Sequence, residues 1–278
     1  MEVDKLENKK IAIIGIGNMG KALTYGLLRH RTISPSNLIL SDPTFADLVH
    51  FKKLSVKLTS DNKEAAKNAD VIILAVKPQI ILSVLEDIKH LVSQDQLIIS
   101  IAAGIEIKII KSILESRQPV VRVMPNLCAK VGESMSCWVK SKEVTRANTE
   151  IVREILEVIG KEILLENESL LDRITAISGS GPAYVFYFTE IFVKSAIKLG
   201  IDKNLAEKLV LQTLIGSVKL LENMQEKASI LKQQVTSKGG TTETALNEFN
   251  SSGVDKIFIK AINAAYKRSK ELRIKSLL

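Results

Sequence analysis

The sequence feature that most constrains the fold of this chain is the segment KKIAIIGIGNMGKALTYGLL, in which an apolar run is followed by a glycine-rich turn and an amphipathic stretch. Gly15, Gly17 and Gly20 form the pattern G-x-G-x-x-G between an expected strand, Lys10–Gly15, and a helix expected to reach about Arg29. Gly15 permits a tight turn, Gly17 lets the backbone approach a pyrophosphate, and Gly20 lets helix and strand pack closely. The free N–H groups of the helix N-terminus attract phosphate. We therefore predict a dinucleotide-binding unit, with a ligand-free glycine-rich turn as the alternative.

The first half of the chain alternates apolar runs with helical patterns. Runs such as VIILAV and LIISIA carry no charge, as strands buried on both faces of a parallel sheet require. Helical patterns lie between them, at Asp61–Ala69, Gln79–Leu91 and Ile107–Leu114. This alternation predicts an α/β fold with a Rossmann-type doubly wound sheet. The expected strands are Lys10–Gly15, Asn37–Ser41, Asp70–Val76, Gln96–Ala102, Val120–Met124, Ser134–Val139 and Glu162–Leu165.

After about Glu168 the pattern becomes helical, and no further strand is expected. Pro182–Leu199 is apolar around most of its circumference, so a helix here must be buried on several sides. Gly200 is placed to end that helix, and further helices are expected at Asp202–Met224 and Asp255–Leu272. The sequence thus predicts an all-helical second half through which at least a homodimer forms.

Composition excludes several classes of function. The 39 basic and 31 acidic residues give a formal charge of +8, but Lys alternates with Glu and no basic block is present, which argues against nucleic-acid binding. Such a surface would instead help to collect small anions. No run reaches the roughly 18 apolar residues of a membrane span, and Met1–Lys10 lacks the core of a signal peptide, so we expect a cytoplasmic protein. Cys128 and Cys137 are expected to be free thiols, and no metal site is predicted.

The residues after the second expected strand bear on the choice of dinucleotide. Asp42 lies about twenty residues past the last glycine, where an acid binds the adenosine ribose and repels a 2′-phosphate, which favours NADH. If Asp42 points away, Ser41 and Thr44 could hold a phosphate with help from Lys52 or Lys53. NAD(P)H is therefore the predicted cofactor, with NADH favoured and NADPH left open.

Two glycine-rich segments belong to the second half. In Ser178–Tyr184, SGSGPAY, Ser180 can cap a helix and Pro182 can occupy its first turn, so a helix start is expected; a plain interdomain turn is the alternative. In Ser237–Thr244, SKGGTTET, two glycines could form a nest of N–H groups ahead of a helix reaching about Asn250. That arrangement suits a carboxylate, and a plain capped helix is again the alternative.

The motifs occur in one order along the chain: GIGNMG at 15–20, AVKP at 75–78, SIAAG at 100–104, RVMPN at 122–126, SGSGPAY at 178–184 and S-x-GGTT at 237–242. Together they resemble the pyrroline-5-carboxylate reductase family over essentially the whole chain. The resemblance implies a dinucleotide-binding Rossmann domain at 1–166 and a helical dimerisation and substrate-binding domain at 167–278. It also implies NAD(P)H-dependent reduction of Δ1-pyrroline-5-carboxylate to L-proline, the last step of proline biosynthesis, with active sites at the dimer interface.

Site residues follow from the motifs and the resemblance. Lys77 is expected to contact phosphate or ribose, although it could be a solvated surface residue, and Thr242 matches a hydroxyl near the ring nitrogen of the substrate. The expected cofactor-binding residues are Gly15, Gly17, Asn18, Met19, Gly20, Ser41, Asp42, Asn62, Ala75, Val76, Lys77, Pro78, Ala102, Ala103, Gly104 and Asn126. The expected substrate-binding residues are Ser237, Gly239, Gly240, Thr241 and Thr242.

Reduction of a cyclic imine is consistent with the absence of histidine from the sequence motifs. None of the three histidines, His30, His50 and His90, lies in a motif, whereas an alcohol dehydrogenase generally needs a general base. A protonated imine is already electrophilic, and it needs only a hydride, a proton on nitrogen and an anchor for its carboxylate. We therefore expect orientation to supply most of the acceleration, with the Thr242 hydroxyl hydrogen-bonding the nitrogen.

Some positions depart from the family pattern, and two other functions compete. Leu127-Cys128 and Lys238 replace the usual Thr-Pro and Pro, and Gln225–Ser229 lacks the usual Pro-Gly pair, so the carboxylate loop is less restricted in φ. A degenerate nucleotide-binding sensor is therefore one alternative. A β-hydroxyacid dehydrogenase is the other, but it should carry a Lys soon after the glycine-rich helix start, and Ala183–Ile191 has none.

Overall fold

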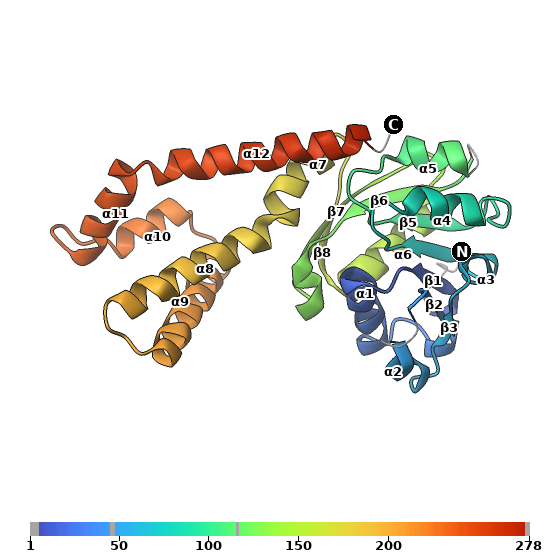
Figure 1. Ribbon diagram of the computed structural model, residues 1–278, viewed down its shortest axis with the longest axis horizontal. Coiled ribbons are helices and arrows are strands. Elements are labelled where there is room, and N and C mark those ends of the chain that lie inside the picture. Colours follow the sequence, from blue (N-terminus) through green and yellow to red (C-terminus); the bar gives the residue numbers. More distant parts are fainter. Residues whose placement is uncertain (1–5, 45–47, 115–116, 276–278) are drawn as a thin grey trace. The chain divides into compact units, whose positions relative to one another are not determined.

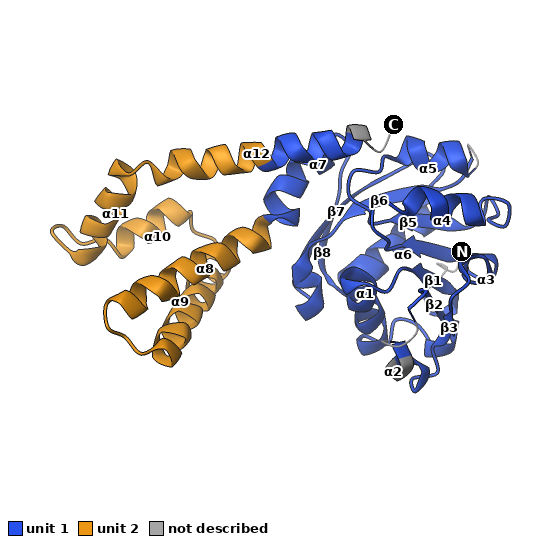
Figure 2. Ribbon diagram, in the orientation of Figure 1, with its two compact units in different colours: residues 1–180, 265–278 blue, residues 181–264 orange. Residues whose placement is uncertain are grey.

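The computed structural model describes residues 6–44, 48–114 and 117–275. The chain divides into two compact units, residues 1–180 with 265–278 and residues 181–264 (Figure 2). The first unit is α/β and the second is helical. The first unit continues to residue 180, past the domain boundary expected between residues 166 and 167. One reason is that Leu171 is fully buried in a cluster with Cys137 and Val139 of the sheet.

One eight-stranded sheet forms the centre of the first unit, in the order β3-β2-β1-β4-β5-β6-β7-β8 (Figure 1). The strands from β1 to β6 pair in parallel, β7 is antiparallel to β6, and β8 is parallel to β7. The prediction of a doubly wound α/β sheet is confirmed. The bounds are β1 Ile11–Ile14, β2 Leu38–Ser41, β3 Lys57–Thr59, β4 Val71–Leu74, β5 Leu97–Ser100, β6 Val120–Met124, β7 Ser134–Lys140 and β8 Gly160–Leu164.

Helices cover both faces of this sheet (Figure 1). In β1, Ile11 and Ile13 pack into one apolar cluster, and Ala12 and Ile14 pack into the other, as the two-residue period of a strand requires. The first cluster includes residues of α1 (Asn18–Arg29), α2 (Val49–Lys52) and α6 (Arg146–Glu157). The second includes residues of α3 (Asn62–Lys67), α4 (Ile81–Ile88) and α5 (Ile107–Ile113).

The segment SGSGPAY contains the expected helix start, with Pro182 in the first turn of the new helix, but the expectation that Ser180 caps it is wrong. A short helix, α7 (Leu170–Ile174), continues into a π-helix, Thr175–Gly179, before α8 (Gly181–Lys198) begins. Ser180 has αR dihedral angles and donates its N–H to Thr175 O at 2.8 Å, so it does not have the extended backbone of an N-cap. π-Helical turns are rare and often lie at functional sites.

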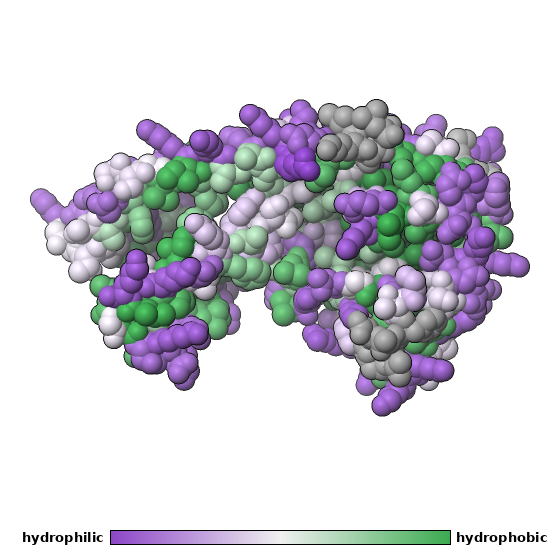
Figure 3. Space-filling model, in the orientation of Figure 1, coloured by the Kyte–Doolittle hydropathy of each residue, from purple (hydrophilic) through white to green (hydrophobic). Residues whose placement is uncertain are grey.

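The second unit is built from α8, α9 (Lys203–Met224), α10 (Ala228–Gln234), α11 (Thr241–Ser251) and the first part of α12 (Val254–Lys275). The three long helices expected from the sequence are all present, and Gly200 adopts a positive φ after α8. Large apolar side chains stay exposed on α8, α9 and α12, and apolar surface on this unit is visible in Figure 3. Within the described part of the chain, no helix is long and apolar enough to cross a membrane.

Candidate active site

The glycine-rich turn lies at the carboxyl edge of the parallel strands, where the strand order reverses between β1 and β4. Such a switch point is where doubly wound sheets bind ligands. The N–H of Gly15 donates to Ser41 O, and that of Ala75 donates to Ile14 O, both at 2.8 Å. Gly15 has φ +94°, and a Cβ there would lie 2.7 Å from Val76 Cγ1. The turn and the AVKP segment are therefore in direct contact.

The N-terminus of α1 offers unused backbone donors beside open space. Gly17 is its N-cap and makes no side-chain cap, and the first N–H to reach back along the helix is that of Lys21, to Gly17 O at 3.0 Å. The N–H groups of Asn18, Met19 and Gly20 thus have no acceptor within the helix. A Cβ on Gly17 would meet nothing within 4 Å, whereas one on Gly20 would clash with Gly15 O. These features fit a pyrophosphate at Gly17 and close helix–strand packing at Gly20.

Asp42 points towards the glycine-rich turn. Its Oδ2 accepts from the Ile16 N–H at 2.8 Å, and its Oδ1 accepts from the Thr44 N–H at 2.9 Å. Ser41 is buried and donates its hydroxyl to Asn62 Oδ1 at 2.8 Å. The carboxylate is therefore held at one end of an open pocket of about 380 Å³, which is lined by Ile16, Gly17, Asn18, Lys21, Asp42, Thr44 and Leu48.

On the other side of the switch point, four of the expected cofactor-binding residues follow β5 and β6: Ala102, Ala103, Gly104 and Asn126. The side chain of Ala102 is buried in the core, and Gly104 has φ +79°, so this loop presents mainly backbone to the sheet edge. Asn126 Oδ1 accepts from the Cys128 N–H at 3.0 Å, and its Nδ2 donates to Ser178 Oγ at 3.2 Å. The Asn126 amide thus helps to hold its own loop, and Ser178, on the π-helix, is its partner. Sequence reasoning did not assign Ser178 this role.

The substrate loop expected at Ser237–Thr242 belongs to the second unit. It turns at Gly239, φ +74°, into α11, which begins at Thr241 as expected. The two glycine amides do not form an open nest: Gly239 N donates to Glu243 Oε2 at 2.7 Å, and Gly240 N donates to Ser237 O at 3.0 Å. The first N–H to reach back along the helix is that of Thr244, to Gly240 O. The donors left for an anion are those of the first turn, residues 241–243.

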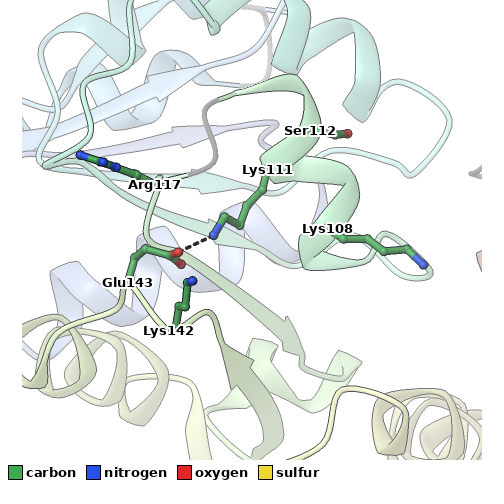
Figure 4. Close-up of a pocket in the computed structure, with 6 residues that line it drawn as sticks. All are labelled: Lys108, Lys111, Ser112, Arg117, Lys142 and Glu143. Carbon is green, nitrogen blue, oxygen red and sulfur yellow. Dashed lines mark ion pairs between the residues drawn. The ribbon is translucent and has the colours of Figure 1, made fainter.

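A separate basic pocket of about 770 Å³ lies between α5 and the turn that joins β7 to α6. Its side chains do not converge on one point: Lys111 and Lys142 turn towards Glu143, whereas Lys108, Ser112 and Arg117 point elsewhere (Figure 4). Lys111 Nζ pairs with a Glu143 oxygen at 2.7 Å, and both side chains are largely buried. Burial alone would raise the pKa of Glu143, but hydrogen bonds from Lys111 and Ser141 outweigh it and hold the pKa at about 2.

This low pKa predicts acid-sensitive stability. The ordinary value is 4.5, so the folded state keeps Glu143 ionised more readily than the unfolded state does. Its stabilising contribution is present above about pH 4.5 and is lost as the pH falls towards 2. We expect Glu143→Gln to lower the free energy of unfolding by about 1 kcal/mol at pH 7 and by much less at pH 3, measured by urea denaturation. An equal loss at both pH values would contradict this assignment.

A dinucleotide-binding sheet followed by a helical unit with open apolar faces defines a two-part oxidoreductase. Residues 10–104 match the family described as NADP oxidoreductase coenzyme F420-dependent, and residues 168–272 match that described as pyrroline-5-carboxylate reductase dimerisation. The chain belongs to the pyrroline-5-carboxylate reductase family. Membership in this family favours the reductase over the β-hydroxyacid dehydrogenase considered from the sequence. It also supports an oxidoreductase rather than a nucleotide-binding sensor.

The similarity covers nearly the whole of each relative. The chain is 36% identical to the pyrroline-5-carboxylate reductase of Methanosarcina acetivorans over 96% of this chain and 99% of that protein. It is 36% identical to that of Haemophilus influenzae over 96% and 98%. The crystal structure of Plasmodium falciparum pyrroline carboxylate reductase with NADP bound is similar with a TM-score of 0.89 and 33% identity, over 96% of this chain and 99% of that one.

Proposed function

We propose that this protein reduces Δ1-pyrroline-5-carboxylate to L-proline with a reduced nicotinamide dinucleotide. The observation that carries the proposal is near full-length similarity to reductases of that name, together with an open α1 N-terminus and an intact GGTT segment. At least two chains associate through the helical unit, whose exposed apolar side chains on α8 and α9 would otherwise face water.

The residues of the first unit bind and orient the dinucleotide. The α1 N–H groups bind its pyrophosphate, Asp42 binds the adenosine ribose, and the loops after β5 and β6 border the nicotinamide, since they lie across the switch point from Asp42. When bound, the reduced nicotinamide supplies a hydride. The C5 carbon of the imine accepts it, and the electron pair of the broken C=N π bond stays on the nitrogen that carries the proton.

The second unit supplies the groups for the substrate. The first-turn N–H groups of α11 bind the carboxylate, and the Thr242 hydroxyl hydrogen-bonds the ring nitrogen. The Glu243 carboxylate stays on Gly239 N, where it holds the turn that orients this helix start. Orientation of two bound reactants can supply about 7–11 kcal/mol of the barrier reduction, so no ionising base is required of the chain.

The direct test mixes purified full-length protein with pyrroline-5-carboxylate and NADH or NADPH. Loss of absorbance at the reduced-nicotinamide band, with stoichiometric formation of proline, is the expected result. A matched reaction with a 2-oxo acid or a 3-hydroxy acid and the appropriate nicotinamide tests the dehydrogenase alternative. Cofactor binding without turnover of pyrroline-5-carboxylate would sink the proposal and favour the sensor.

We infer that NADH is the preferred cofactor, because the Asp42 carboxylate is held at the ribose pocket by two backbone N–H groups. A 2′-phosphate would meet this negative charge. We expect Asp42→Ser to raise kcat/KM for NADPH relative to NADH by about tenfold to 100-fold, measured with both cofactors under saturating imine. Serine keeps an acceptor for the Ile16 N–H, so an unchanged melting temperature is expected. If the cofactor ratio does not move, Asp42 does not face the ribose.

A further inference from the structure

The loop that follows β5, residues 101–106, is tied at its end to two other elements of the first unit. Glu106, its last residue, accepts from Arg273 of α12, with Arg273 Nε and Glu106 Oε1 3.4 Å apart. Arg273 Nη1 also lies 3.0 Å from Oδ2 of Asp172 on α7. One guanidinium thus joins the β5–α5 loop to α7 through two carboxylates. The next residue, Ile107, donates its N–H to Glu168 Oε1 at 3.0 Å.

The same part of α12 also touches the loop through its backbone. A Cβ on Gly104 would lie 3.4 Å from both Arg273 N and Leu272 C, which is ordinary van der Waals distance, so the loop and the helix are in contact here. Gly104 has φ +79°, a conformation that L side chains rarely adopt. Gly104 is therefore suited to the loop by its conformation.

Arg273 and Arg122 divide the acidic groups beneath them: Arg273 is the nearer partner of Asp172, at 3.0 Å, and Arg122 is the partner of Glu168. Arg122, which is 4% exposed in β6, already pairs with Glu168 at 2.9 Å and lies 3.9 Å from Asp172 Oδ1. Asp172 also accepts from Ser269 Oγ at 3.5 Å. The side chain of Arg273 is 24% exposed, at the rim of this network. Removing Arg273 leaves Arg122 paired with Glu168, but it frees the loop and also takes the nearer cation from Asp172, whereas removing Glu106 frees the loop alone from this network.

We propose that Arg273 is a positioning residue for the reduction: by bridging Glu106 and Asp172 it holds the β5–α5 loop where that loop borders the nicotinamide. This rests on the proposed function, which places the nicotinamide on the β5 and β6 side of the switch point. Arg273 touches neither cofactor nor substrate in this role. It acts through residues 102–104, whose backbone faces the sheet edge, and small displacements of such groups strongly reduce rates.

The sharpest variants are Glu106→Ala and Arg273→Met. Glu106 is at the N-cap position of α5 but makes no side-chain cap hydrogen bond, so its removal leaves the Arg273–Asp172 pair in place and otherwise frees only the exposed Lys108, which pairs with Glu106 at 2.7 Å. Arg268→Met is the matched control on α12, because Arg268 pairs within its own helix, with Glu271 at 2.7 Å. Arg273→Lys keeps the charge but has no planar fork to span two carboxylates, so it should rescue in part.

Hydrogen exchange of the ligand-free, full-length protein measures the tether directly. In Glu106→Ala and Arg273→Met we expect faster exchange in peptides covering 101–107. We also expect kcat reduced about tenfold, with KM for the imine changed less than about threefold. Hydride transfer should become more rate-limiting, so the primary isotope effect with deuterated NADH should rise. The double variant should be no worse than either single one, and Arg268→Met should match the wild type in every measurement.

Two results would overturn the inference. One is unchanged exchange at 101–107 in both variants; the other is a double variant whose losses are the product of the single losses, since that would mean that the two side chains act independently. A wild-type protein that binds NADH but does not reduce pyrroline-5-carboxylate would contradict the proposed function instead. In that case exchange at 101–107 and the fluorescence of bound NADH would still decide whether Arg273 orders the loop.

Discussion

Replacing Gly17 with alanine is expected to weaken NADH binding about 100-fold while leaving the melting temperature within about 1 °C. The backbone of Gly17, φ −73° and ψ −159°, suits an L-amino acid, and its Cβ would meet no protein atom within 4 Å. The methyl group would instead occupy the space into which the pyrophosphate must come to reach the α1 N–H groups. The dissociation constant is measured by NADH fluorescence and the melting temperature by calorimetry.

Gly20→Ala is the contrasting variant. Its Cβ would clash with Gly15 O, so strand and helix must separate and the free energy of unfolding should fall by about 1–3 kcal/mol. The two glycines, three residues apart, are thus expected to separate a loss of ligand binding from a loss of stability. A Gly17→Ala protein that binds NADH as tightly as the wild type would mean that the pyrophosphate lies elsewhere.

The second large effect is expected at Thr242, in the first turn of α11. Thr242→Ala should lower kcat/KM for pyrroline-5-carboxylate about 100-fold, because the ring nitrogen loses its hydrogen-bond partner, and should leave NADH affinity within about twofold. The measurement is steady-state kinetics at saturating NADH. Thr242→Ser retains the hydroxyl and should recover most of the activity.

Thr244→Ala is the matched control for Thr242. The Thr244 hydroxyl donates to Gly240 O at 3.1 Å within the same helix start. The Thr244→Ala variant therefore tests whether removing a threonine from this helix start is enough to disturb the loop. Equal losses in Thr242→Ala and Thr244→Ala would assign the effect to the helix start rather than to the imine nitrogen. Wild-type kinetics in Thr242→Ala would remove its role in the reaction.

The strand, turn and helix around Gly15–Gly20 were predictable because their signals are local. The residues that determine this strand, turn and helix all lie within about twenty consecutive positions, so the sequence pattern alone identifies them. The Gly15–Gly20 turn has the expected geometry. Strand β3, Lys57–Thr59, was missed because it has three residues and only Thr59 is buried, too short for a periodic pattern. Strand β8 begins at Gly160, two residues earlier than expected, because Gly160 pairs with Ser134 of β7.

Features that depend on tertiary partners were not predictable from composition. Gly, Ser and Pro at 178–182 are typical of a turn, yet packing within the first unit makes 175–179 a π-helix. The nest expected at Gly239 and Gly240 is closed by Glu243, whose spacing from the N-cap is that of a capping box. One signal was present and unused: Arg122 interrupts an apolar strand, and a buried charge there requires acidic partners, which are the half-buried Glu168 and the buried Asp172.

The sparse interior of the second unit has a consequence for how this protein is handled. Across residues 181–264 the fully covered apolar side chains are those of Ala196, Ala206, Val210 and Leu231, a small number for five helices. In the proposed association through this unit, chains cover the remaining apolar surface of one another, so folding of the unit and association draw on the same free energy. The melting temperature should therefore rise with protein concentration, and dilution should destabilise the helices of this unit.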